Sequence, residues 1–591
     1  MALKQRSEIA TELTWNLSDI FADEATFERA LADVKRQAEA FTAAHRGRLA
    51  EADESRLLAV LSEYEQLRIG MEKVSAFTQL DLAADFTNAA SQKRMKAMQQ
   101  ALTPVFGDLT FLESELLQLA DDTLEKLAES RFGAYINRLR RMKAHRFSAE
   151  TERILAGHSM LQELPYQVYE TAKLGDLTFP DFTVNGDTHP LSYSLYETVY
   201  AESPDSDVRR AAHDAFYDTI ATQRQTMALV YFTETAAQKA VADLRGFASV
   251  FDMLLLPQEV TRDLYDRQID VLMRELAPVM RRYAEKLKNN YGLDRLTYAD
   301  LRLPASPVHD RTVTVADAWQ LVHDALAVMG EDYQAVVRQA EKERWVDFAQ
   351  NIGKSTGGFC LSLHDLHSYI LLNWNGGISE VFTLAHELGH AVQGKLAAEH
   401  NSVLQEDPSL YFVEAPSTLH ELLLTNHLLA KNSDPESVRR VAGHMVGKTY
   451  FHNCVTHLLE AAFQREVYRT VEAGGSLSAD DFDSLYLNVL RQFWGDAVEL
   501  PASAGRTWMR QPHYYMGLYP YTYSAGLTVA TAVSARIRTE GQAAVSDWIE
   551  TLKLGGSVAP LELAKRAGVD LSTEAPLRTM IGVIAELVDL I

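Results

Sequence analysis

The chain lacks the features that mark secreted or membrane-embedded proteins. Its 591 residues include only two cysteines, Cys360 and Cys454, which are too few for a disulfide framework and match neither zinc-finger spacing nor a CxxC redox motif. The N-terminal stretch MALKQRSEIATELTW has no apolar core of a signal peptide, and no run approaches the roughly 18 apolar residues of a membrane span. We therefore expect a cytoplasmic protein without a membrane partner.

Positive charge is also scarce. Lys and Arg number 57 against 81 Asp and Glu, which gives a formal net charge of -24 and a pI near 5.2. This balance argues against nucleic acid or an anionic membrane as a partner, because both attract basic surfaces. With 47% hydrophobic residues, the chain is nevertheless able to bury a large core and to form several lobes.

Most of the chain has the apolar spacing of amphipathic helices. Segments such as ATFERALADVKRQAEAFTAAH and DTLEKLAESRFGAYINRLRRMKAH repeat apolar residues at three-and-four intervals and are rich in Ala, Leu, Glu and Lys. An exception is LTFPDFTVNGDTHPLS, in which Asn185-Gly186 between alternating stretches predicts a β-hairpin. The sequence thus predicts a mainly α-helical protein with little sheet.

Residues 386 to 390 read HELGH, two histidines four apart with a glutamate after the first. Positions i and i+4 share a helix face, so His386 and His390 can each direct a ring nitrogen at one metal ion roughly 2.0 to 2.1 Å away. Glu387 points about 100° round the helix, beside the metal and not on it. In a zinc hydrolase, the general base that takes a proton from the metal-bound water lies beside the metal, as Glu387 would. The pentapeptide therefore indicates a zinc hydrolase.

A pentapeptide can arise by coincidence, but its surroundings favour a helix. Residues 379–398 carry apolar side chains at helical spacing after an Asn-Gly-Gly turn, and Ser379 is the expected N-cap. The preceding segment, Tyr369 to Trp374, reads as a strand. We expect it to be the edge strand of a small sheet, to which a substrate peptide adds by main-chain hydrogen bonds. Such binding tolerates many side chains.

A third metal ligand is expected from a second helix, and Glu414 is our choice. It begins the segment EAPSTLHELLLTNHLLA, 24 residues after His390, which leaves room for one helix to end and another to return alongside. Glu421, seven residues later on the same face, is expected to accept a histidine N–H. Glu399, Glu406 and Glu421 remain rival ligands, although Glu406 lies in a polar loop that we expect to be solvated.

Two other histidine pairs are predicted not to bind metal. His364 and His367 are flanked by segments that read as strands, and residues three apart on a strand face opposite sides. His452 and His457 lie on a predicted amphipathic helix, where packing or lining a cleft is the commoner role.

The segment from Pro512 to Gly526, PHYYMGLYPYTYSAG, holds one histidine and five tyrosines. Attack of water on a peptide carbonyl builds negative charge on its oxygen, and Tyr O–H or His N–H donors placed there stabilise the tetrahedral species. His513 and one or two of Tyr519, Tyr521 and Tyr523 are the candidates. Tyr514 and at least one other ring are expected to be structural.

The combination of HELGH with VEAPSTLHE resembles the thimet oligopeptidase and oligoendopeptidase F family of zinc peptidases, the latter branch more closely. LTWNLSDIF, KSTGGFC, YILLNWNG and HYYMGLYPYTYSAG support the resemblance, which runs from about residue 15 to about residue 570. It implies one zinc ion held by His386, His390 and Glu414, and Glu387 as the base. It also implies oxyanion donors from the C-terminal segment, for which we choose His513, Tyr521 and Tyr523.

By the same resemblance, we expect a two-lobed, zincin-type helical fold around a deep substrate channel, with a small sheet next to the active-site helix. The expected divisions are an N-terminal helical region (1–110), an oligopeptidase F N-terminal-like domain with the hairpin (111–200) and a peptidase domain (201–591). The expected activity is endohydrolysis of short oligopeptides, with folded proteins excluded. A carboxypeptidase of related architecture and a catalytically silent peptide-binding protein are the alternatives.

Overall fold

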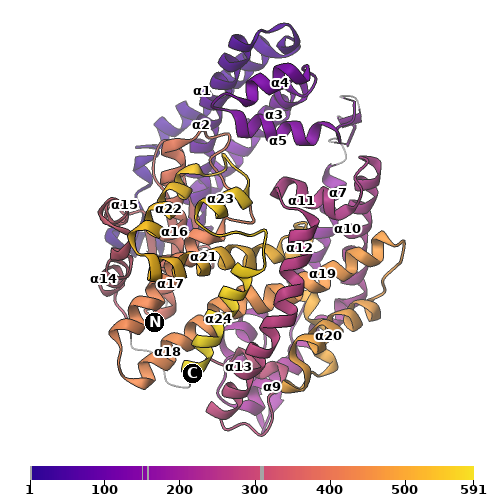
Figure 1. Cartoon of the computed structure of the whole chain (residues 1–591), viewed down its shortest axis with the longest axis vertical. Helices are drawn as coiled ribbons and strands as arrows, with labels where there is room; N and C mark the ends of the chain where they lie inside the picture. Colours follow the sequence, from indigo (N-terminus) through magenta and orange to yellow (C-terminus); the bar gives the residue numbers. More distant parts are fainter. Residues whose placement is uncertain (1–2, 149–150, 153, 156–158, 307–311) are drawn as a thin grey trace. The chain divides into compact units, whose positions relative to one another are not determined.

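The computed structural model describes residues 3–148, 151–152, 154–155, 159–306 and 312–591 (Figure 1). The chain forms two compact units, each built from three stretches of sequence. The first unit comprises Met1–Ala144, Asp310–His427 and Val533–Val569, and the second comprises His145–His309, Leu428–Ala532 and Asp570–Ile591. Helices predominate in both units and the sheets are small, so the predicted fold class is confirmed.

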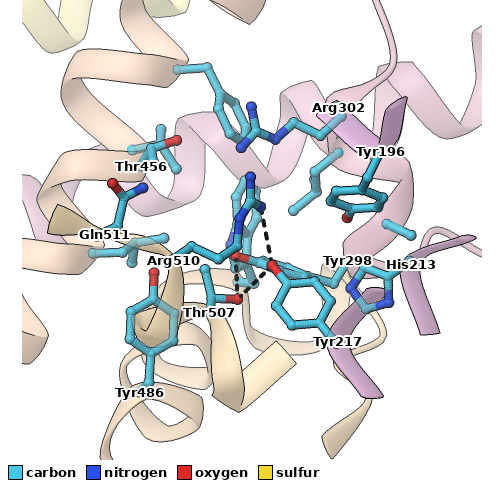
Figure 2. Close-up of a pocket in the computed structure, with 16 residues that line it drawn as sticks. Tyr196, His213, Tyr217, Tyr298, Arg302, Thr456, Tyr486, Thr507, Arg510 and Gln511 are labelled. Carbon is cyan, nitrogen blue, oxygen red and sulfur yellow. Dashed lines mark hydrogen bonds between the residues drawn. The ribbon is translucent and has the colours of Figure 1, made fainter. Parts of the chain in front are cut away.

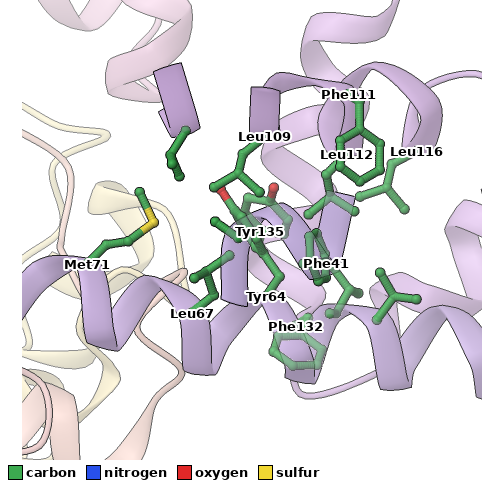
Figure 3. Close-up of a cluster of buried hydrophobic side chains, with 14 of the residues drawn as sticks. Phe41, Tyr64, Leu67, Met71, Leu109, Phe111, Leu112, Leu116, Phe132 and Tyr135 are labelled. Carbon is green, nitrogen blue, oxygen red and sulfur yellow. The ribbon is translucent and has the colours of Figure 1, made fainter. Parts of the chain in front are cut away.

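The N-terminal part of the first unit is a helical bundle. Its helices are α1 (Glu24–His45), α2 (Glu54–Ala84), α3 (Ala89–Leu116), α4 (Asp121–Ala128) and α5 (Gly133–Lys143). Asp23 and Asp53 cap α1 and α2 by accepting a backbone N–H from the first turn. The apolar faces meet in one buried cluster, in which Phe41, Tyr64 and Leu112 lie together (Figure 3). Burial of these faces is what stabilises the bundle.

A three-stranded sheet follows in the first unit. Its strands are β3 (Val346–Ala349), β4 (Phe359–Leu361) and β5 (Tyr369–Trp374). Their order is β3-β5-β4, with β3 parallel and β4 antiparallel to β5. The prediction of β5 as an edge strand is therefore wrong: its first four residues are all buried, which is typical of a strand covered on both faces and paired on both sides. The edge beside it is β4.

Among the remaining helices of the first unit, α16 (Ile378–His400) packs on the sheet and carries the HELGH motif. The others are α14 (Val315–Leu326), α15 (Glu331–Lys342), α22 (Gln542–Leu554) and α23 (Pro560–Arg566). The predicted N-cap of α16, Ser379, is wrong. The helix begins at Ile378, and Gly377 is its N-cap, with no side-chain cap. Asn375 Oδ1 instead accepts the N–H of Gly377 at 2.8 Å and so shapes the turn that enters the helix.

Two helices contain the boundary between the units, α17 (Glu414–Lys431) and α21 (Pro520–Glu540). The other helices of the second unit are α7 (Ser159–Glu170), α8 (Tyr193–Leu195), α9 (Ser206–Ile220), α10 (Arg224–Leu244), α11 (Val250–Leu255), α12 (Arg262–Val271), α13 (Ala277–Asn290), α18 (Pro435–His444), α19 (His457–Glu472), α20 (Ala479–Trp494) and α24 (Ala575–Leu590). In the part of the chain that the structure describes, no helix combines the length and apolar character needed to cross a bilayer.

The predicted hairpin is confirmed in the second unit. Strands β1 (Phe182–Val184) and β2 (Asp187–His189) pair antiparallel around Asn185-Gly186, and both turn residues have positive φ, 53° and 92°. Two positive φ angles are the requirement of a type I′ turn, which asparagine and glycine meet at little cost.

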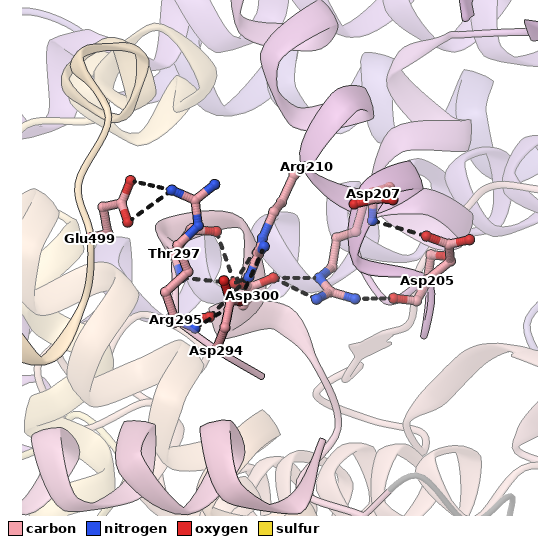
Figure 4. A network of polar contacts seen from close by, with 10 residues as sticks. Asp205, Asp207, Arg210, Asp294, Arg295, Thr297, Asp300 and Glu499 are labelled. Carbon is pink, nitrogen blue, oxygen red and sulfur yellow. Dashed lines mark hydrogen bonds and ion pairs between the residues drawn. The ribbon is translucent and has the colours of Figure 1, made fainter. Parts of the chain in front are cut away.

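A buried ion network holds α9 of the second unit against the loop before residue 300 (Figure 4). Asp300 is fully buried and receives Arg209 Nε at 2.9 Å on one oxygen and Arg210 Nη2 at 2.9 Å on the other. The N–H and hydroxyl of Thr297 donate to the second oxygen at 2.7 and 2.9 Å. Burial alone would raise the pKa of Asp300, but these donors outweigh it and hold the pKa below its ordinary value.

Candidate metal centre and catalytic residues

The three predicted metal ligands converge in the first unit. Nε2 of His386 and Nε2 of His390, one turn apart on α16, both lie 3.3 Å from Oε2 of Glu414. Glu414 is the first residue of α17, so its carboxylate reaches α16 from the start of the neighbouring helix. One ligand atom from each side chain lies within 4.8 Å of the other two. The two helices therefore bring the predicted set together.

This spacing fits a zinc ion. Two donor atoms bound at roughly 2.0–2.1 Å to one tetrahedral ion lie about 3.3 Å apart. Both histidine-to-carboxylate separations have this value. Two imidazoles and one carboxylate are also the donor set of catalytic zinc sites that keep a fourth position for water or substrate.

Further side chains orient the ligands. Glu421 Oε1 lies 2.8 Å from His386 Nδ1, so Nδ1 carries a proton and Nε2 is the nitrogen that faces Glu414. Ser417 donates its hydroxyl to Glu414 Oε2 at 2.9 Å. Sequence reasoning found Glu421 in this role but missed Ser417, although its position three residues after Glu414 on a helix was the available signal.

The electrostatics of the site favour a cation. Burial by itself would lower the pKa of His386, but Glu414 and Glu421 outweigh it and raise that pKa well above its usual value. Burial would likewise raise the pKa of Glu414, yet the two imidazoles hold it well below its usual range. Both shifts have one cause, the mutual stabilisation of positive charge on the imidazoles and negative charge on the carboxylates.

The glycine of HELGH permits the approach of the two helices. A Cβ atom on Gly389 would lie 2.5 Å from the carbonyl oxygen of Pro416 and 2.6 Å from Cα of Ser417, which are backbone atoms that cannot turn aside. A side chain here would push α17 away from α16 and carry Glu414 with it. The glycine is thus required for the approach of Glu414 to the two histidines.

His420 joins three elements of this unit and was not singled out by sequence reasoning. Its Nδ1 lies 2.9 Å from the carbonyl oxygen of Ala385, and its Nε2 lies 2.6 Å from the hydroxyl of Tyr333 on α15. Burial lowers the pKa of His420 to about 3, so the ring is neutral, with Nδ1 as donor and Nε2 as acceptor. The ring ties the backbone next to His386 to two other helices.

Glu387 occupies a buried position beside the ligands. Glu387 is 6% exposed. Burial raises the pKa of its carboxyl above the ordinary value, although both histidines act to lower it. A Cβ atom on Gly358, the residue before β4, would lie 3.4 Å from Glu387 Oε1. The backbone that leads into the edge strand therefore passes directly beside the predicted base.

The rival carboxylates lie elsewhere. Glu406 is not solvated as predicted: it is largely buried and pairs with His364 Nδ1. The segments that flank His364 and His367 are strands, as predicted, but both histidines lie in the turn between β4 and β5, so the argument from opposite strand faces does not apply to them. His367 Nε2 lies 3.2 Å from Asp19. Glu399 pairs with Lys395 at the end of α16.

The predicted oxyanion donors belong to the second unit. His513 lies in a short 3₁₀ turn, Pro512–Tyr515, and its ring centroid is 5.3 Å from that of Tyr519 and 5.6 Å from that of Tyr523. Tyr521 is 1% exposed and donates its hydroxyl to Gln258 Oε1 at 2.6 Å. Tyr514 is buried, as predicted. The rings of Tyr519, Tyr523 and His513 thus gather on one side of the segment, and the hydroxyl of Tyr521 lies in the interior.

A small polar cavity of about 40 Å³ lies in the second unit, next to the residues before His513 (Figure 2). Arg510 reaches the Tyr217 hydroxyl at 3.3 Å and also pairs with Glu197. Two buried nitrogens on its wall, Arg510 Nε and His213 Nε2, have no hydrogen-bond partner among the described residues. The volume is enough for a few waters, which would satisfy both nitrogens.

The chain matches known proteins along most of its length. A model of peptidase family M3 matches residues 199–583, and a model described as oligopeptidase F matches residues 115–179. The chain is 25% identical to oligopeptidase PepF of Bacillus subtilis (strain 168), over 99% of this chain and 88% of that protein. It is 26% identical to an oligoendopeptidase F homolog of Lactococcus lactis subsp. lactis (strain IL1403), over 96% and 95%.

Solved structures share the fold. A peptidase from Chlamydophila abortus has a TM-score of 0.87 at 22% identity, with 100% of both chains covered. Oligoendopeptidase-F from Enterococcus faecium has a TM-score of 0.72 at 23% identity, with 95% of this chain and 97% of that chain covered.

These matches define the class of protein, a peptide hydrolase. The chain belongs to peptidase family M3, whose members are metallopeptidases, and within it to the oligoendopeptidase F group. The resemblance found in the sequence is thereby confirmed.

Proposed function

We propose that the chain is a zinc-dependent endopeptidase that cleaves short oligopeptides internally and leaves folded proteins intact. His386, His390 and Glu414 are the proposed ligands of one zinc ion per chain. The observation that carries the proposal is the convergence of two imidazole nitrogens on one carboxylate oxygen, each at 3.3 Å. When bound, zinc supplies a Lewis acid that polarises the scissile carbonyl and acidifies water.

Glu387 is the proposed general base. It accepts a proton from the attacking water and passes it to the leaving amine. Its burial makes the carboxylate a stronger base than an exposed glutamate, because the charged form is poorly solvated. Glu421 and Ser417 do not react. They hold His386 and Glu414 in the orientation that the metal requires.

His513 and Tyr523 are the proposed donors to the developing oxyanion, with Tyr519 as the neighbouring alternative. The mutual proximity of these three rings supports the choice. Tyr521, although predicted among the donors, has its hydroxyl engaged with Gln258, so we propose that it positions the segment and does not contact substrate.

Substrate is proposed to add to β4. Its outer edge is unpaired within the described sheet, and its entry at Gly358 lies beside Glu387. Main-chain pairing with β4 would place a scissile bond near the base without demanding particular side chains. The expectation of broad sequence tolerance is thus kept, with β4 in place of β5.

A cytoplasmic location is part of the proposal. Both cysteines are unpaired, and the acidic composition gives no reason to expect a nucleic acid or membrane partner. The division at residues 110 and 200 stays a prediction.

Replacement of Glu387 by Gln tests the central assignment. We expect the Glu387→Gln variant to keep its zinc and to lose peptidase activity by about 10²–10⁴-fold, because the amide of glutamine cannot accept the proton from water. Activity is measured on an internally quenched fluorescent peptide, and zinc by elemental analysis. Glu399→Gln, an exposed carboxylate on the same helix, is the matched control and should keep full activity. A Glu387→Gln rate near that of the control would remove Glu387 from this role.

Mass spectrometry of the products separates the alternatives. Internal cuts support an endopeptidase, whereas stepwise loss of C-terminal residues would indicate a carboxypeptidase. Absence of turnover by the wild-type chain with added zinc, on a panel of peptides that it binds, would favour a silent peptide-binding protein.

A further inference from the structure

Glu460, on α19 of the second unit, is a buried carboxylate that the proposed mechanism does not use. It is 0% exposed. Its Oε2 accepts from His457 Nδ1 at 2.7 Å, whereas its Oε1 is buried without a hydrogen-bond partner among the described residues. Burial alone would raise the pKa of Glu460, but His457 and His513 outweigh it and lower the pKa to about 2. A buried, ionised carboxylate is costly in free energy unless both of its oxygens accept hydrogen bonds.

His513 faces this carboxylate. Its Nδ1 lies 4.0 Å from Glu460 Oε2, and that nitrogen too is buried and without a partner. The side chain as a whole is 20% exposed, so the exposed part of the ring is not the side that carries Nδ1. A shift of the ring by about 1 Å would form a charge-assisted hydrogen bond, whose ordinary length is roughly 2.7–2.9 Å.

The backbone that carries His513 is held on both sides. On the N-terminal side of His513, Arg510 contacts Glu197 and Tyr217, and Figure 2 shows the contact with Tyr217. After His513, Gln464 on α19 donates to the carbonyl oxygen of Gly517 at 2.9 Å. The short turn is thus tied to the same helix as Glu460, which leaves the side-chain torsions of His513 as its main freedom.

The other neighbours of Glu460 do not use its free oxygen. His457 Nε2 lies 3.2 Å from His452 Nε2, so one of these nitrogens donates to the other. Burial, and to a lesser extent the nearby His457, lowers the pKa of His452 to about 3. His452 is therefore neutral and carries a single ring proton. The ring of Tyr523 stacks on His457 at 3.9 Å between centroids. A carboxylate oxygen can accept more than one hydrogen bond, so Oε2 can serve His513 Nδ1 as well as His457.

A second metal ion is the obvious competing explanation, because His457, Glu460 and His513 each offer a ligand atom within 4.8 Å of the others. Their spacing argues against it. Donors on one tetrahedral ion lie about 3.3 Å apart. The separations here are 2.7 Å, the length of a hydrogen bond with a shared proton, and 4.0 Å.

We propose that Glu460 is a positioning residue for His513. Its carboxylate accepts the Nδ1 proton of a doubly protonated His513, which fixes the ring and directs the second N–H, on Nε2, toward the exposed side, where it donates to the carbonyl oxygen of the substrate. His457 donates to the same carboxylate, and the ring of Tyr523 packs on the ring of His457. This inference rests on the proposed function, in which His513 is an oxyanion donor.

A double-mutant cycle tests the inference. We expect Glu460→Gln to lower kcat by about 10–100-fold with KM nearly unchanged, the usual cost of losing a partner that orients an active group. In a His513→Ala background the same change should cost nothing further, because Glu460 acts only through His513. Glu466→Gln, a partly exposed carboxylate on the same helix, is the matched control and should behave as wild type.

An equal loss from Glu460→Gln in both backgrounds would assign Glu460 a structural role and overturn the proposal. So would elemental analysis that finds two metal ions per chain. Failure of the wild-type chain to cleave peptides would instead reject the proposed function. That result is distinct from the outcome of the double-mutant cycle, which compares variants of an active enzyme.

A second measurement needs neither turnover nor a change at Glu460. Nitrogen NMR of histidine-labelled wild-type protein, with His513 assigned from its loss in a His513→Asn variant, reports which ring nitrogens carry a proton. We expect a protonated Nδ1. An unprotonated Nδ1 would contradict the inference even if Glu460→Gln does not fold.

Discussion

At the scale of single residues, the site depends on acceptors that face a common position. Two imidazole nitrogens meet one carboxylate oxygen, to which Ser417 also donates. The opposite pKa shifts of His386 and Glu414 mean that positive charge beside Glu414 is stabilised at this position. Metal binding and the local stability of the site are therefore linked.

Removal of Glu414 should expose this linkage. We expect Glu414→Ala to weaken zinc binding by more than the roughly 10–100-fold that follows the loss of an outer partner, because a direct ligand is removed. Competition with a fluorescent chelator measures the affinity. Glu406→Ala, which removes a rival carboxylate paired with His364, should bind zinc as wild type does. Full occupancy of Glu414→Ala at low free zinc would contradict the assignment.

Glu234 provides a residue-scale test of pH dependence. Burial raises its pKa to about 7, against 4.5 for the exposed group, and Gln238 donates a hydrogen bond to it. From about pH 4.5 to 7 the folded chain keeps a proton that the unfolded chain releases, so stability falls as pH rises through this window. Glu234→Gln removes that loss. At pH 8 the free energy of unfolding of the variant should exceed that of wild type by on the order of 1–3 kcal/mol, seen as a higher melting temperature. Near pH 4.5 the two proteins should melt at the same temperature.

The matched control lies on the same helix. Asp243 is exposed on α10 and pairs with Lys239, so Asp243→Asn should show no gain that depends on pH. A Glu234→Gln variant whose difference from wild type is the same at both pH values would mean that Glu234 is not protonated in the folded chain.

At the scale of elements, α16 and α17 act together. Gly389 meets the backbone of Pro416 and Ser417, and His420 returns from α17 to the carbonyl oxygen of Ala385. The position of Glu414 relative to the histidines is therefore set by helix packing and not by its own side chain alone.

Gly389→Ala should separate the two helices. We expect zinc affinity to fall by at least about tenfold and the free energy of unfolding to fall by about 1–3 kcal/mol, as in other overpacked interiors. Gly107→Ala is the matched control, because Gly107 lies in α3 with nothing within 4 Å of its added Cβ. The control should be neutral or slightly stabilising. An unaffected zinc affinity in Gly389→Ala would show that α17 can shift without loss of the site.

The elements also show where sequence reasoning reached its limit. The helical motif, the pairing of HELGH with Glu414 and the Asn185-Gly186 turn were predictable, because each depends on local periodicity or on the chemistry of two residues. The place of β5 within its sheet was not, since it depends on which distant segments pair with it. For the same reason, sequence alone did not separate Tyr521, whose hydroxyl meets Gln258 far along the chain, from Tyr523.

At the scale of the whole molecule, each unit is closed by segments distant in sequence, and polar networks help to hold them. In the second unit, Asp300 collects two arginines and Thr297 in a place without solvent. Breaking a buried pair leaves the other charge uncompensated, which costs more than the pair itself contributes.

Asp300→Ala should therefore destabilise the chain by about 3–5 kcal/mol, measured as a fall in the melting temperature of the second unit. Asp243→Ala, which breaks an exposed ion pair in the same unit, should cost under about 1 kcal/mol. A similar small loss for both variants would show that the network contributes little to folding.

The proposed pairing of substrate with β4 has a consequence for the peptides that escape cleavage. Pairing along a strand needs an amide hydrogen at alternate residues of the incoming chain, and proline has none. Fragments with proline at those places would be spared while fragments of equal length and ordinary composition are consumed. Wherever this protein is the main route of peptide turnover, the surviving pool would drift toward proline-rich remnants, and enzymes specific for proline would be needed to finish the work.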